Sequence, residues 1–142
     1  MITGIFDIQS EEAMTELGRN IASSLSPSDI ICLYGDLGVG KTFLTRSIIQ
    51  SLCGEDVIVP SPTFTLAQPY STPLGMLHHF DLYRIEDSEE LMDIGWEDAL
   101  NEGICMIEWP EKAGVYLPMN YTKITLKKSD KEKRQVIIES IS

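Results

Sequence analysis

A chain of 142 residues is about the size of one ordinary domain, and its 43% of hydrophobic and 23% of charged residues exclude a disordered protein. Eleven Lys and Arg against 22 Asp and Glu give a net charge of −11. This charge argues against a free-standing nucleic-acid-binding protein, because such a protein needs a basic surface.

Hydrophobic spacing and turn residues predict alternating helices and strands along the chain. The first predicted helix follows a capping Ser10, has apolar residues every three or four positions and ends before Pro27. Of two later helical segments, one stops at Gly54 and the other is interrupted at Gly95. The strands are short runs that are either continuously apolar or alternating. In chain order, the expected elements are a helix at 10–25, a strand at 30–34, a helix at 43–52, a buried strand at 57–59, a hairpin of 64–70 with 76–83, helical residues 88–101, a strand at 104–107, and a closing hairpin of 121–126 with 135–141.

These elements predict the fold class. No linker or internal repeat divides the chain, so we expect one α/β domain over residues 1–142. Buried strands that alternate with helices predict a mixed, mainly parallel sheet with flanking helices, and the two hairpins add antiparallel strands.

One segment carries a specific chemical signal, the sequence GDLGVGKT at residues 35–42. It matches the phosphate-binding loop pattern G-x-x-x-x-G-K-[ST] (Walker A) and lies between a predicted strand and a predicted helix, as a P-loop does. Glycines let consecutive backbone amides approach phosphate oxygens, Lys41 adds a positive charge, and the Thr42 hydroxyl is a ligand for Mg²⁺. The expected nucleotide-binding residues are Gly35, Asp36, Leu37, Gly38, Val39, Gly40, Lys41 and Thr42. The alternative is a structural turn with an incidental lysine.

A P-loop enzyme also needs acidic groups near its metal. Glu108 follows the apolar run ICMI at the carboxyl end of a predicted strand, where ligands of such sheets bind. Asp81 is a second candidate on the strand HFDL, with pairing to Arg84 as the alternative. Thr63 follows a Ser-Pro pair and could contact the γ-phosphate or the metal.

The two adjacent histidines point to opposite faces of a strand, which favours packing over a metal site for His78 and His79. The guanine-specific segment Asn/Thr-Lys-x-Asp is absent from the sequence, so we expect adenine as the base.

The sequence also indicates the cellular location of the protein and the charge of a possible partner. No apolar run is long enough to span a membrane, and the acidic residues near the N-terminus do not suit a signal peptide. The three cysteines form no CxxC pair, so they indicate neither disulfide bonds nor a zinc site. We therefore expect a soluble cytoplasmic protein. Residues 81–111 carry 11 acidic residues and one basic residue. This block is either a solvated surface or a docking surface for a basic partner.

Four motifs in order resemble the TsaE (YjeE) family of bacterial P-loop ATPases, which are required for threonylcarbamoyladenosine formation in tRNA. The motifs are the P-loop at 35–42, SPTFTL at 61–66, HFDLYR at 79–84 and IEWP at 107–110, and the similarity extends over nearly the whole chain. Phe64 stands where many relatives have Tyr.

The resemblance implies roles for individual residues. It implies Thr42 and Glu108 as Mg²⁺ ligands, Lys41 and Asp81 as further catalytic groups, and Thr63 as a switch threonine.

The same resemblance implies that Trp109 is needed for activity, with plain packing as the alternative, and that Glu11 and Arg134 approach the nucleotide.

The resemblance also implies a role in a larger assembly. In the family, TsaD with TsaB transfers the threonylcarbamoyl group to adenosine 37 of tRNAs that read codons beginning with A, and the ATPase sustains turnover. Mg²⁺ is then the cofactor, ATP the substrate and ADP the product, and tRNA is contacted only through the complex. The alternatives are a P-loop small-molecule kinase, which needs a cluster of arginines not seen among Arg19, Arg46, Arg84 and Arg134, and a nucleotide-gated binding module.

Overall fold

The computed structural model describes residues 1–60 and 66–142, and in this part of the chain the centre is a seven-stranded sheet. The strand order is β1-β7-β6-β2-β5-β4-β3. The strands are β1 (Gly4–Ile8), β2 (Ile30–Tyr34), β3 (Ala67–Thr72), β4 (Gly75–Asp81), β5 (Ile104–Glu108), β6 (Tyr121–Lys128) and β7 (Arg134–Ile141). The helices are α1 (Glu11–Ser24), α2 (Lys41–Cys53) and α3 (Trp96–Glu102), with the 3₁₀ helices η1 (Ser88–Ile94) and η2 (Pro110–Tyr116).

The sheet is mixed, as predicted. At its centre, β2 lies parallel to both β5 and β6, and β4 lies parallel to β5. The outer pairings of β3 with β4, β6 with β7 and β1 with β7 are antiparallel. Half of the pairings in the described sheet are therefore parallel, fewer than the mainly parallel arrangement expected, because a hairpin at each side and the N-terminal strand extend the parallel centre.

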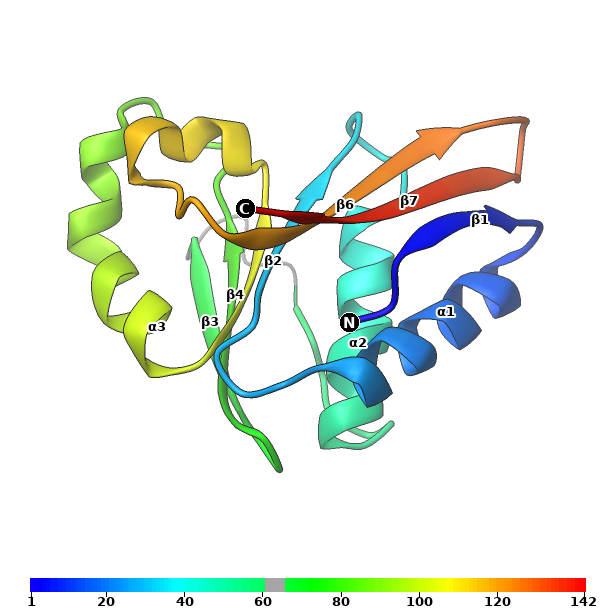
Figure 1. Cartoon of the computed structure of the whole chain (residues 1–142), viewed down its shortest axis with the longest axis horizontal. Helices are drawn as coiled ribbons and strands as arrows, with labels where there is room; N and C mark the ends of the chain where they lie inside the picture. The colour runs from blue at the N-terminus through cyan, green and yellow to red at the C-terminus, as the bar shows by residue number, and fades with distance from the viewer. Residues whose placement is uncertain (61–65) are drawn as a thin grey trace.

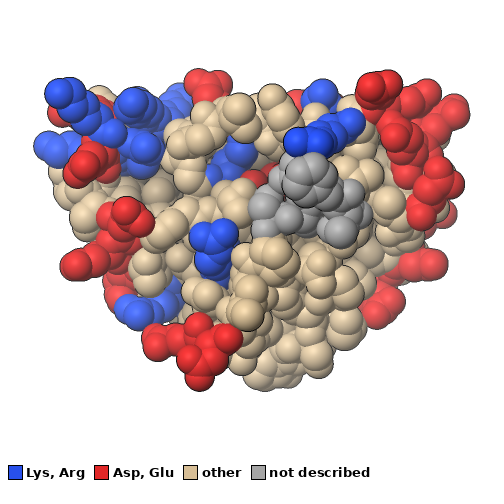
Figure 2. Space-filling view, turned by 180° about the vertical axis from the view of Figure 1, so that it is seen from behind, with Lys and Arg blue, Asp and Glu red and all other residues tan. Residues whose placement is uncertain are grey.

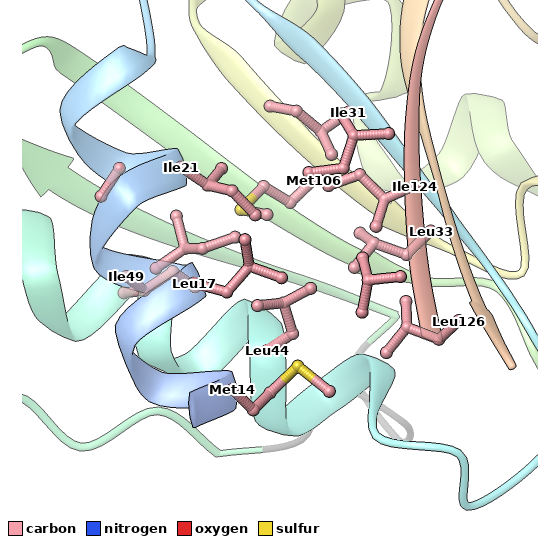
Figure 3. Close-up of a cluster of buried hydrophobic side chains, with 14 of the residues drawn as sticks. Met14, Leu17, Ile21, Ile31, Leu33, Leu44, Ile49, Met106, Ile124 and Leu126 are labelled. Carbon is pink, nitrogen blue, oxygen red and sulfur yellow. The ribbon is translucent and has the colours of Figure 1, made fainter. Parts of the chain in front are cut away.

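Helices cover both faces of this sheet (Figure 1). On one face, α1 and α2 pack against the strands through a large cluster of buried apolar side chains, shown in Figure 3. On the other face, η1, α3 and η2 enclose a second cluster that includes Phe80 and Trp96. The central strands β2 and β5 are buried on both sides, which explains why their sequences are almost continuously apolar.

The first helix begins and packs for reasons visible in the sequence. The Ser10 hydroxyl accepts a hydrogen bond from the amide of Ala13 at 3.1 Å and caps α1. Gly18 lies where α1 crosses α2, and a Cβ atom there would lie 2.6 Å from the Cβ of Ser47. This glycine lets the two helices approach closely.

The helical region predicted at 88–101 divides where predicted. Gly95 adopts a left-handed conformation, with φ 74° and ψ 32°, and separates η1 from α3. The β3–β4 hairpin is confirmed, although its predicted start at 64 and 65 lies outside the described residues. The strand at 104–107 and the closing hairpin are also confirmed.

One predicted strand is wrong. Residues 57–59 form no strand; instead, the carbonyl of Val57 accepts a hydrogen bond from Gln50 and that of Val59 accepts one from Arg46, both on α2. This apolar segment packs on the helix and not beside another strand. The structure also has two elements that were not predicted, β1 at the sheet edge and η2.

Across residues 1–60 and 66–142, no helix is long and apolar enough to cross a membrane.

Candidate active site

The loop between β2 and α2 takes a shape that depends on its glycines. Gly35, Gly38 and Gly40 have φ values of 149°, 78° and 115°, which residues with side chains rarely adopt. A Cβ atom on Gly35 would also lie 2.7 Å from the carbonyl oxygen of Leu126. The N-terminus of α2 follows at Lys41 with no side-chain cap, so its positive dipole end faces the loop.

A pocket of about 370 Å³ opens on one side of this loop. It brings together five residues that the sequence predicted to act in one site, from three different parts of the fold. These residues are Lys41, Thr42, Asp81, Glu108 and Trp109.

Lys41 is buried and held in place by its surroundings. Its ammonium donates hydrogen bonds to the carbonyls of Gly35 and Asp36, and it lies 3.7 Å from the centre of the Trp109 ring. Burial lowers the pKa of Lys41 below its ordinary value, and nearby carboxylates, Glu108 foremost, oppose this shift only in part.

Glu108 lies at the centre of a buried chain of hydrogen bonds. The Thr42 hydroxyl donates to its Oε1 at 2.7 Å, and His79 Nε2 lies 2.6 Å from its Oε2. The chain joins the start of α2 to β5 and β4. His79 is a site residue that the sequence analysis missed, because it assigned this histidine to ordinary packing.

The strand register explains how these groups meet. In the parallel pair of β4 and β5, Asp81 lies beside Glu108, and His79 lies beside Met106. Alternation places the side chains of His79, Asp81 and Glu108 on the sheet face that α2 covers. His78 points to the opposite face and stacks on Phe80, so the prediction that the two histidines diverge is confirmed.

Asp81 and Trp109 also line the pocket. Asp81 is 6% exposed, and its Oδ1 accepts a hydrogen bond from the Tyr83 amide at 3.0 Å. Trp109 has a left-handed backbone, with φ 59° and ψ 49°, and its ring centre lies 4.9 Å from that of Tyr83. This conformation turns the indole toward Lys41 immediately after the strand ends.

A second pocket, of about 540 Å³, lies on the other side of the P-loop. The start of α1 and the tip of the β6–β7 hairpin line it, and it contains both Glu11 and Arg134. Arg134 also donates a hydrogen bond from Nε to the carbonyl of Val39 at 3.0 Å. Gly38, Gly40 and Phe43 line both pockets, so the loop separates two adjoining spaces.

The expected role of Thr63 cannot be compared with this geometry, since residue 63 lies outside the described part of the chain.

The donor groups in the first pocket suit Mg²⁺. The Thr42 hydroxyl and the Glu108 carboxylate are both oxygen donors, and they lie 2.7 Å apart at the pocket wall. Mg²⁺ prefers oxygen ligands and takes most of them from water and substrate phosphates, with one or two carboxylates. A set of only two donors therefore fits, and within the described residues no group of three or more His, Cys, Asp or Glu forms a closed metal site.

Figure 2 shows basic side chains mainly at one end of the molecule, while acidic side chains are dense at the other end and also lie along the lower side and below the basic group. Basic side chains gather over the β6–β7 hairpin, and acidic side chains gather over η1 and α3 at the opposite edge. The acidic end corresponds to most of the 81–111 block.

Comparisons with known proteins agree with this architecture. The crystal structure of Bacillus subtilus YdiB superposes with a TM-score of 0.79 at 23% identity, and the match covers 99% of this chain and 87% of that one. At this identity the match shows the fold.

Sequence relatives show the family. The family "Threonylcarbamoyl adenosine biosynthesis protein TsaE" matches residues 8–136. The tRNA threonylcarbamoyladenosine biosynthesis protein TsaE of Rickettsia bellii is 42% identical over 127 residues, which are 89% of this chain and 88% of the relative. The protein of the same description in Bacillus subtilis is 32% identical over 131 residues, which are 92% of this chain and 81% of the relative. This chain therefore belongs to the TsaE family.

Proposed function

We propose that this protein is a Mg²⁺-dependent ATPase that supports formation of threonylcarbamoyladenosine at position 37 of tRNAs reading codons that begin with A. The observation that carries the proposal is the first pocket, where a P-loop lysine and a Thr–Glu oxygen pair lie together at the start of α2. Membership of the TsaE family supplies the tRNA context.

The P-loop binds the phosphates of ATP. The backbone amides of the loop and the first turn of α2 face the phosphate oxygens, as in other P-loop proteins. Lys41 leaves the carbonyls of Gly35 and Asp36 and pairs with the β- and γ-phosphates. The wall formed by Trp109 excludes water from that charge and strengthens its pairing.

Thr42 and Glu108 would hold the metal. Bound there, Mg²⁺ would supply positive charge that offsets the negative charge of the phosphates. Asp81, in register with Glu108, accepts a hydrogen bond from the attacking water and orients it toward the γ-phosphorus. Thr63 adds a contact to the γ-phosphate or the metal by the family resemblance alone.

The nucleoside extends past the loop into the second pocket. Gly38 and Gly40 line both pockets, so a ligand with phosphates in the first has space for its sugar and base next to the loop, beside Glu11 and Arg134. We propose adenine as the base.

The protein acts in the cytoplasm with TsaD and TsaB and contacts tRNA only through that pair. A net charge of −11 opposes direct binding to the phosphates of tRNA. A tRNA-binding enzyme presents a basic surface, and the acidic 81–111 block is complementary to such a surface. The expected basal rate is slow, and we expect docking to raise it.

The proposal is tested by ATP hydrolysis of the purified protein, alone and with TsaD and TsaB from the same source. Slow hydrolysis that the pair stimulates and that Lys41→Ala abolishes is the expected result. Lys112→Ala is the matched control, since Lys112 is an exposed lysine on η2 outside both pockets. Near wild-type hydrolysis in Lys41→Ala, or transfer of phosphate to a small acceptor, would overturn the assignment.

A further inference from the structure

The carboxylate of Glu108 has a partner behind the pocket wall. His79 lies on β4 with its side chain 0% exposed, and its Nε2 lies 2.6 Å from Glu108 Oε2. Glu108 is itself 2% exposed. His79 does not line the pocket, so it reaches the site only through this carboxylate.

The ring makes a single polar contact among the described residues. Its Nδ1 is buried and has no hydrogen-bond partner there. A carboxylate oxygen can only accept, so the contact to Glu108 requires the proton on Nε2. An apolar side chain of similar volume would fill this position without burying an unpaired nitrogen, which costs free energy. The energetic benefit of a histidine here therefore lies in its bond to Glu108.

That bond fixes which oxygen faces the site. With Oε2 held by His79, the carboxylate presents Oε1 to the Thr42 hydroxyl at 2.7 Å. Both oxygens are thus fixed by groups on two other elements, α2 and β4. Without the histidine, the Thr42 hydroxyl would be the one remaining side-chain partner of the carboxylate in the described structure, and rotation of the carboxyl group about its terminal bond would be less restricted.

We propose that His79 is a positioning residue that orients Glu108 for metal binding. This inference rests on the proposed function, because it assumes that Glu108 and Thr42 hold the metal. Residues behind metal ligands that fix their orientation contribute on the order of 10- to 100-fold to metal affinity.

Two substitutions of His79 by an amide side chain test whether the hydrogen bond to Glu108 matters, apart from the polarity and packing of the side chain. In His79→Gln, the amide nitrogen is the same number of bonds from Cα as Nε2 of histidine and reaches Glu108. In His79→Asn, the amide is one bond shorter and loses the contact. Asn at the adjacent position, in His78→Asn, is the matched control, because His78 faces the other side of the sheet, with its Nε2 3.9 Å from Glu102 Oε1.

The experiment measures Mn²⁺ binding in the presence of ADP by electron paramagnetic resonance, together with thermal unfolding of each variant. We expect His79→Asn to weaken Mn²⁺ binding by about 10-fold or more. His79→Gln and His78→Asn should stay close to wild type. In hydrolysis, His79→Asn should raise the Mg²⁺ concentration needed for half-maximal rate, while the ATP KM at saturating Mg²⁺ changes little.

The outcomes distinguish this inference from the proposed function. If the wild-type protein neither binds Mn²⁺ in the presence of ADP nor hydrolyses ATP, both the proposed function and this inference are overturned. Wild-type binding together with equal Mn²⁺ affinity in folded Gln and Asn variants would overturn the positioning role alone. Loss of folding in both His79 variants would assign the residue to stability and would also overturn it.

Discussion

The two pockets beside the P-loop are built in different ways. The first draws three of its four charged groups from the interior, with Lys41 5%, Asp81 6% and Glu108 2% exposed, and only Arg84 is exposed. The second draws them from the surface, where Glu11 and Lys131 are exposed at a helix start and a hairpin tip. The same P-loop glycines line both.

The difference in burial indicates where a substitution should reduce activity most. A buried charged group is compensated by specific partners, and removing one leaves the others unpaired in the interior. An exposed group is partly replaced by water. We therefore expect changes in the first pocket to abolish steps of the reaction and changes in the second to adjust affinity.

The largest effect should follow loss of the central carboxylate. Glu108→Ala removes the acceptor of both Thr42 and His79, and with it one of two proposed metal-binding groups. A metal ion contributes several kcal/mol to transition-state stabilisation, so we expect hydrolysis to fall about 10²-fold or more.

Steady-state hydrolysis at saturating Mg²⁺ measures this fall, with Glu111→Ala as the control. Glu111 is an exposed carboxylate on η2 that lines neither pocket. Equal activity in the two variants would remove Glu108 from the metal site and break the contrast between the pockets.

An intermediate effect should follow loss of the indole beside Lys41. Cation–π contacts at desolvated sites contribute about 2 kcal/mol. We expect Trp109→Leu to lower kcat/KM for ATP by about 10-fold or more, and Trp109→Phe, which keeps an aromatic face, to lower it less. If Leu and Phe lower kcat/KM equally, Trp109 acts by packing alone.

A smaller effect is expected in the second pocket. Arg134→Gln removes a cation from that pocket together with the hydrogen bond to the Val39 carbonyl. We expect the ATP KM to rise about fivefold, equivalent to about 1 kcal/mol, with kcat little changed. Kinetics of Lys133→Gln, which changes an exposed neighbour outside the pocket, serve as the reference. A loss of kcat as large as that of Glu108→Ala would show that the second pocket shares the chemistry.

The smallest effect lies outside both pockets, in the cap of η1. Backbone hydrogen bonds from the amides of Asp87 and Glu86 lower the pKa of the Glu90 carboxyl. A lowered pKa means that the carboxylate stabilises the folded state above its ordinary pKa of about 4.5, and that this stabilisation is lost as the pH falls through the lower folded-state value. Glu90→Gln should therefore lower the melting temperature slightly at pH 7.

The difference from wild type should shrink below pH 4.5, and ATP hydrolysis at pH 7 should not change. Thermal melting at several pH values measures it, with Glu89→Gln as the reference variant. A difference that stays constant from pH 7 to pH 3 would contradict the role of the carboxylate in this cap.

The helices and strands that the sequence predicts correctly are those determined by local hydrophobic periodicity and turn residues. The helix after Ser10, the strand before Gly35 and the helix after Gly40 each have periodicity or turn residues that few other structures satisfy. The segment 57–59 misled the prediction, because an apolar run packs equally well on a helix or beside a strand. The edge strand β1 is mostly exposed, so its sequence lacks the continuous apolar run that marks the equally short strands β2 and β5.

The same distinction between local and non-local determinants applies to the residues of the site. Lys41 and Thr42 belong to one contiguous motif, and Glu108 ends a recognisable strand, so their convergence in one pocket could be predicted. The contact between His79 and Glu108 depends on the register of β4 against β5 and on which face α2 covers. Neither the strand register nor the position of α2 can be predicted from the residues around His79. The sequence analysis therefore assigned this histidine to ordinary packing.

Most basic side chains lie at the β6–β7 end of the molecule and the dense acidic group on η1 and α3 lies at the other end, which gives the molecule an electric dipole moment along its length. In the field of a charged partner, such a molecule rotates before the surfaces touch, and a basic partner meets η1 and α3 first while the β6–β7 hairpin points away. The alignment acts over roughly a Debye length, about 8 Å at physiological ionic strength. Added salt should therefore slow the encounter far more than it shortens the lifetime of the complex.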